Sequence, residues 1–176
     1  IGAYGAALAL KHMGPSFAAI AVGSALGVLT AALLALAIGL FSLRVRAIFF
    51  AMVTLAVASA FEVLISQLSH LTGGEDGLNY AIPHVLTPAF RLVEERVLGV
   101  RMDGRLIAYY VVFACALALL LLMLRMVNSP FGRVLEAVRE NAFRADAIGY
   151  RVVRYRTAAT VLSAVIAALA SVLLAL

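Results

Sequence analysis

Four long apolar runs restrict the possible folds of this chain more than any other feature of its sequence. They cover residues 17–43, 47–69, 106–127 and 157–176. Each run meets the requirement of about 20 mostly apolar residues for an α-helix that crosses a bilayer. Residues 1–10 are also apolar and give part of a further span. The runs therefore predict an all-α fold, a polytopic bundle of transmembrane helices.

The composition excludes a soluble domain. Apolar side chains make up 65% of the 176 residues and charged ones 13%, whereas the apolar share of a soluble domain is about 45–50%. The spans also exclude a nucleic-acid-binding module, although the pI is near 9.9. The chain begins at Ile1 without a methionine and stops at Leu176 inside an apolar run. We therefore expect a single transmembrane domain that is a fragment of a longer membrane protein, truncated at both ends.

The basic residues give the orientation of the spans, because positively charged loops are retained on the cytoplasmic side. If residues 128–156 are a cytoplasmic loop, the turn at residues 44–46 is cytoplasmic too, and residues 11–16 and 70–105 face outward. With Arg125 included, the inner side then has a net charge of +6 and the outer side is neutral. The basic excess of the chain is therefore a topology signal.

Small side chains recur at every fourth position of the run 17–43, which places them along one helical face. Lipid gives helices no hydrophobic reason to associate, so such faces associate through close van der Waals contact of their backbones. Gly23 and Gly27 form a literal GxxxG pair. We expect helix packing through Ala19, Gly23, Gly27, Ala31, Ala35 and Gly39. A weaker repeat in the last span consists of Ser163, Ala167, Ser171 and Ala175.

One ionisable group, Glu62, lies inside a span. Ser59 and Ser66 fall on the same helical face. A carboxylate at membrane depth costs about 2.5–3.5 kcal/mol on insertion scales, so it normally faces a bundle interior or a water-filled path. This face is therefore a candidate for the translocation path or the bundle interior. A structural pairing with an arginine or a helix end explains Glu62 equally well, and both interpretations stay open.

The outer loop contains few regular signals. Gly73, Gly74 and Gly77 forbid a regular helix near its start. Thr87 can then cap a short surface helix whose first turn holds Pro88.

The segment that begins at Asn128 is typical of an amphipathic helix. Ser129 is a capable N-cap, and Gly149 provides a stop after Ile148. An apolar stripe at helical spacing consists of Phe131, Leu135, Val138, Ala142 and Ala145. The other side is charged, and it pairs Glu136 with Arg139 and Glu140 with Arg144 at favourable spacings. A helix lying on anionic lipid would be more uniformly basic, so the pattern favours an interaction surface for a soluble partner.

Several kinds of chemistry have no support in this sequence. His12, His70 and His84 lack the paired spacing and acidic neighbours of a zinc site, so no metal site is predicted. No phosphate-binding loop of the GxxxxGK[ST] type occurs, and the chain is not expected to bind ATP by itself. No Ser or Cys is set beside a His within a span, so no catalytic residues are predicted.

Several stretches together resemble the permease subunits of branched-chain amino acid ABC importers, of the LivM type. These are IGAYGAAL at residues 1–8, LRVRAIFFAMVTLA at 43–56, TGGEDGL at 72–78 and SPFGRVLEAVRENAFRADAIGYRVVRYR at 129–156. The resemblance implies a multi-pass subunit of the bacterial inner membrane that forms half of a translocation pathway. It also implies several partners: a second related permease, two cytoplasmic ABC ATPases that bind the ATP, and a periplasmic substrate-binding protein.

The resemblance also implies roles for two segments. The cytoplasmic loop 128–156 would hold the coupling helix that contacts the ATPase, with Phe131, Arg133, Leu135, Glu136, Val138, Arg139, Glu140, Arg144 and Gly149. The start of the periplasmic loop would form the outer mouth, with Thr72, Gly73, Gly74, Asp76 and Gly77.

Three other functions stay open. The first is a secondary transporter that uses Glu62 for ion coupling. The second is a related ABC permease for urea or short amides, and the third is a membrane scaffold without a pathway.

Overall fold

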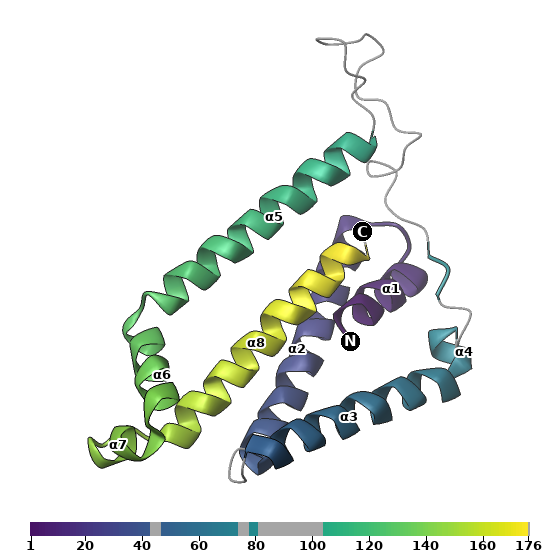
Figure 1. Cartoon of the computed structure of the whole chain (residues 1–176). Helices are drawn as coiled ribbons and strands as arrows, with labels where there is room; N and C mark the ends of the chain where they lie inside the picture. Colours follow the sequence, from purple (N-terminus) through teal and green to yellow (C-terminus); the bar gives the residue numbers. More distant parts are fainter. Residues whose placement is uncertain (43–46, 74–77, 81–103, 176) are drawn as a thin grey trace, which may run out of the picture.

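The computed structural model describes residues 1–42, 47–73, 78–80 and 104–175, and almost all of them are helical (Figure 1). Within these ranges the chain forms no β-strand. The helices are α1 (Gly2–Met13), α2 (Phe17–Ser42), α3 (Ala47–Gln67), α4 (Ser69–Thr72), α5 (Gly104–Val127), α6 (Pro130–Glu140), α7 (Ala142–Ala147) and α8 (Val152–Leu174). The predicted turn at residues 44–46 and the predicted surface helix after Thr87 lie outside the described residues.

Three of these helices are long and apolar enough to cross a membrane. They are residues Phe17–Leu40 of α2, the whole of α5 and the whole of α8, and α3 adds the shorter apolar stretch Ala51–Gln67. The predicted all-α polytopic bundle is therefore confirmed. Helix α8 begins at Val152, before the predicted apolar run starts at residue 157, and so its first turns include Arg154 and Arg156.

The core is the packing of α1 and α8 against α2. All six small residues of the α2 face are buried, namely Ala19, Gly23, Gly27, Ala31, Ala35 and Gly39. A Cβ added to Gly23 would lie 2.6 Å from the carbonyl oxygen of Gly5, and one added to Gly39 would lie 3.0 Å from Cγ2 of Thr157. Helix α1 thus packs on the first half of this face and α8 on the second half.

Helix α8 is also joined directly to α1. The Ala3 N–H donates to Oγ of Ser171 at 3.2 Å, and no room exists for a Cβ on Gly2 beside Ala168 and Ser171. Of the sequence repeat expected to pack in the last span, Ser171 does contact α1. The expectation is wrong for Ser163 and Ala167, which are exposed, whereas Ala168 is buried. Gly2 of α1 therefore meets α8 at both Ala168 and Ser171.

Helices α3 and α5 pack much less than the other long helices. Helix α3 leaves the end of α2 at a wide angle, and α5 runs alongside α8 (Figure 1). In α5 only Gly104 is buried. The described structure is thus a tight α1–α2–α8 unit flanked by two loosely held helices.

Candidate functional site

A tight turn joins α5 to the helix pair α6–α7. Oγ of Ser129 accepts a hydrogen bond from the Gly132 N–H at 3.3 Å and donates one to the carbonyl oxygen of Met126 at 2.6 Å. A side chain at Gly132 would collide with the carbonyl group of Val127. Ser129 is thus the N-cap of α6, with Pro130 in its first turn, and α6 turns sharply away from α5 (Figure 1).

The amphipathic segment is two helices, and the prediction of one continuous helix up to Ile148 is wrong. Helix α6 ends at Glu140, and Asn141 has an extended backbone with φ −155° and ψ 98°. Its Oδ1 accepts a hydrogen bond from the Arg144 N–H at 3.0 Å and so caps α7. Asn competes with the helix backbone for hydrogen bonds and favours such N-cap positions. Glu140 and Arg144 therefore do not form the predicted pair on a single helix.

Helix α7 ends in a tight turn through Gly149. The Tyr150 N–H donates to the carbonyl oxygen of Ala145 at 3.1 Å, and the Gly149 N–H donates to that of Asp146 at 2.9 Å. Gly149 has φ +103°, a conformation that favours glycine at helix ends because it has no Cβ. The chain then enters α8 at Val152.

The apolar stripe of this segment faces the protein. Val138 and Ala145 are each only 3% exposed, and Phe131, Leu135 and Ala142 are half-buried. The charged residues face outward and are all exposed, namely Arg133, Glu136, Arg139, Glu140 and Arg144. The surface open to a partner is therefore the charged face, and the stripe holds the segment in place.

Two large apolar side chains on the open surface were missed by the sequence reasoning. Phe143 is 86% exposed and Ile148 is 70% exposed. Both lie off the apolar stripe, and an isolated Phe among charged residues was the available signal. Exposed aromatic groups in polar surroundings are typical anchors of protein interfaces.

Aromatic rings connect α6 to the start of α8. The rings of Phe131 and Tyr155 are stacked, with centroids 5.7 Å apart and an interplanar angle of 26°. Tyr150 meets Tyr155 edge-on at 5.9 Å. Aromatic pairs in such arrangements contribute about 0.5–1.5 kcal/mol beyond the burial of their area. We call these three residues the aromatic cluster.

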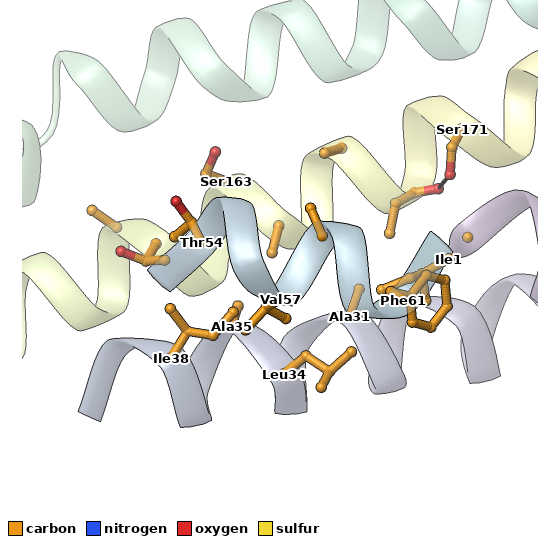
Figure 2. Close-up of a pocket in the computed structure, with 17 residues that line it drawn as sticks. Ile1, Ala31, Leu34, Ala35, Ile38, Thr54, Val57, Phe61, Ser163 and Ser171 are labelled. Carbon is orange, nitrogen blue, oxygen red and sulfur yellow. Dashed lines mark hydrogen bonds between the residues drawn. The ribbon is translucent and has the colours of Figure 1, made fainter. Parts of the chain in front are cut away.

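A cavity of about 800 Å³ lies between α3 and the α1–α2–α8 unit. Figure 2 shows side chains of α2 and α3, among them Ala35 and Val57, facing one another across it. Its lining residues are uncharged. The polar groups among them are the hydroxyls of Thr54, Thr160, Ser163 and Ser171. This first cavity can therefore hold an aliphatic group with hydroxyl contacts.

A second cavity of about 440 Å³ lies between α5, α6 and α8. Its walls are apolar and include Met123, Met126 and Phe131. Three residues of α8 line both cavities: Ala159, Ser163 and Ala167. The second cavity thus connects the α5–α6 turn with the helix that borders the first.

The predicted polar face of α3 does not border the first cavity. Ser59, Glu62 and Ser66 are exposed, and α3 instead lines the cavity with a different face that includes Thr54 and Phe61. The role of Glu62 in a path or a bundle interior stays a prediction.

The predicted outer mouth is described only in part. Oγ1 of Thr72 donates to the carbonyl oxygen of Ile65 at 2.6 Å and to that of Leu68 at 2.9 Å. Gly73 has φ +76° and ends α4 in the left-handed conformation. The remaining residues of this prediction, Gly74, Asp76 and Gly77, lie outside the described residues.

The fold and the α6–α7 segment together define a multi-pass membrane protein with a charged helix pair at one end of its membrane-length helices. A family model described as "Branched-chain amino acid transport system / permease component" matches residues 1–176. The chain belongs to this family of transport permeases, and the resemblance found in the sequence is confirmed. No curated protein and no solved structure gives a match.

Proposed function

We propose that this chain is the permease subunit of an ATP-binding cassette importer in a bacterial inner membrane. It forms half of the translocation pathway for branched-chain amino acids and is driven by a cytoplasmic ATPase that binds the ATP. The family match over the full length of the chain carries this proposal. The uncharged lining of the first cavity fits an aliphatic cargo.

The α6–α7 segment is the contact with the ATPase. It carries charges of both signs on its open face, from Arg133 to Arg144, together with the exposed ring of Phe143. A lipid surface selects basic residues, whereas a protein groove accepts mixed charges around an aromatic anchor. The other partners are a second related permease, a second copy of the ATPase and a periplasmic substrate-binding protein that contacts the outer mouth near Gly73.

Co-purification of the assembly tests this proposal. The full-length protein is purified gently from its native membrane, and every bound chain is identified by mass spectrometry. We expect an ABC ATPase and a second permease, with the ATPase lost after the double charge reversal Glu136→Arg and Glu140→Arg. The control Arg105→Glu reverses an exposed charge at the start of α5, where a helix N-terminus tolerates an acid, and should keep the ATPase. A wild-type protein that purifies alone contradicts the proposal.

Glu62 distinguishes the importer from an ion-coupled secondary transporter. It is an ionisable residue of α3, and such residues within spans often carry ion coupling. Glu62→Gln should leave ATP-driven uptake partly active in liposomes. If uptake instead follows an ion gradient without ATP and the variant abolishes it, the secondary transporter is the correct function.

The cargo is tested in the same liposomes by competition. Branched-chain amino acids should block uptake of labelled leucine, whereas urea and short amides should not. Competition by urea or a short amide would assign the chain to the related permeases for those solutes.

A further inference from the structure

Among the described helices, α8 is the only one that lines both cavities. The first cavity takes its other walls from α1, α2 and α3, and the second from α5 and α6. The shared residues Ala159, Ser163 and Ala167 are four positions apart, so they form one edge of α8. We call these three residues the shared edge.

The shared edge differs from the packed side of α8. Thr157, Ala168 and Val172 are buried, with Thr157 beside Gly39 of α2 and Ala168 beside Gly2 of α1. Ser163 and Ala167 are instead exposed. Two of its three side chains are alanines, so little volume obstructs movement of this edge past α3 or α5. The α1–α2–α8 unit can therefore shift against the two loosely held helices without repacking its own core.

Ser163 is the one hydroxyl of the first cavity without a hydrogen bond in the described part of the chain. Thr54 and Thr160 each donate to a carbonyl oxygen of their own helix at 2.9 Å, and Ser171 does so at 2.8 Å. In Figure 2 the Ser163 hydroxyl is directed away from α2, and Ser163 also lines the second cavity. Among the described residues, Ser163 thus brings an unpaired hydroxyl to the edge of α8 that the two cavities share.

The aromatic cluster lies in line with this edge. Tyr155 is four residues before Ala159, so it falls on the same side of α8 one turn earlier. Its ring is stacked on Phe131 of α6, which itself lines the second cavity. A displacement of α6 by a partner therefore reaches α8 through a direct ring contact.

We propose that the Phe131–Tyr155 contact is the positioning contact that couples α6–α7 to α8 during transport. Movement of α6–α7 by the ATPase shifts the α1–α2–α8 unit, and the shared edge with Ser163 then faces one cavity or the other. This proposal rests on the proposed function, because it requires an ATPase bound to α6–α7. Tyr155 acts through α8 and does not touch the cargo.

Cysteine labelling of the assembled transporter tests this coupling. In a Cys115→Ser background, Ser163→Cys is reacted with a small soluble thiol reagent, either without nucleotide or after trapping with ATP and vanadate. We expect its labelling rate to differ by about tenfold between the two conditions, a typical coupling between distant sites. Lys11→Cys is the control, since Lys11 is exposed and lines neither cavity, and its rate should be equal in both.

The contact itself is tested by two substitutions of Tyr155. Tyr155→Ala should abolish the nucleotide dependence at Ser163→Cys and lower the amount of cargo moved per ATP hydrolysed. Tyr155→Phe keeps the ring and should retain both. Phe131→Leu tests the other ring and should reproduce the Tyr155→Ala result, which covers the case in which Tyr155→Ala does not assemble.

The outcomes separate this proposal from the function on which it rests. If the unsubstituted assembly holds no ATPase, the proposed function fails and the coupling proposal fails with it. If an active ATPase is bound but Ser163→Cys reacts equally in both conditions, only the coupling proposal is overturned. The coupling proposal alone is also overturned if labelling of Ser163→Cys keeps its full dependence on nucleotide in the Tyr155→Ala or Phe131→Leu variant.

Discussion

The contact of α1 with α2 at Gly23 gives a quantitative prediction about stability. A Cβ at this position would lie 2.6 Å from the carbonyl oxygen of Gly5, 2.7 Å from Cβ of Ala9 and 2.8 Å from Cα of Ala6. Non-bonded carbon atoms are best separated by about 3.5–4.0 Å. These neighbours are backbone atoms or a Cβ and cannot rotate away, so the two helices must separate by about 1 Å.

Gly23→Val should therefore lower the free energy of unfolding. Overpacking costs about 1–3 kcal/mol, and three rigid neighbours place this site at the upper end, about 2–3 kcal/mol. Helix propensity opposes the loss by less than about 0.5 kcal/mol, because Val is only a slightly better helix former than Gly. A loss of 2 kcal/mol corresponds to a change of about 30-fold in the folding equilibrium.

Unfolding by sodium dodecyl sulfate in mixed micelles, followed by circular dichroism, measures this loss. Ala25→Val is the matched control, because Ala25 is exposed on the same helix and receives the same side chain. We expect the control to unfold at the wild-type detergent fraction and Gly23→Val at a clearly lower one. Equal midpoints for the two variants would refute the close approach of α1 and α2.

Three further substitutions test the α5–α6 turn, the α1–α8 contact and the open surface. Gly132→Ala should open the turn, because its methyl group meets the Val127 carbonyl group, and trypsin should then cleave faster at Arg133; an unchanged cleavage rate would contradict this geometry. Ser171→Ala removes the hydroxyl that accepts the α1 N–H and should cost about 0.5–1.5 kcal/mol in the same unfolding assay, whereas no loss would mean that this bond is not formed. Phe143→Ser should change stability by less than about 0.5 kcal/mol, as expected of an exposed residue. It should nevertheless weaken retention of the ATPase about tenfold, as expected for an interface anchor, and full retention through a salt wash would exclude Phe143 from the contact.

In the α6–α7 segment, local sequence signals predicted where the first helix begins but not where it ends. Ser129 and Pro130 correctly indicated where α6 begins, because an N-cap and a first-turn proline act through neighbouring backbone groups. The break at Asn141 was missed, although Asn is a favourable N-cap, because the apolar stripe continues across it. A stripe indicates which residues share a face, but not whether the helix between them is continuous.

The sequence by itself indicated the all-α bundle of apolar helices, the family and the small-residue face of α2. These follow from side-chain volume and hydropathy at fixed helical spacing, which are local properties. Only the tertiary structure decided that α1 and α8 divide this face between them. It also decided that the apolar stripe of α6 and α7 faces inward, leaving Phe143 open. The two cavities that share an edge of α8 depend on how helices distant in the chain are placed. Such placement arises from many weak contacts between backbones, and no periodic pattern within one helix records which partner it meets.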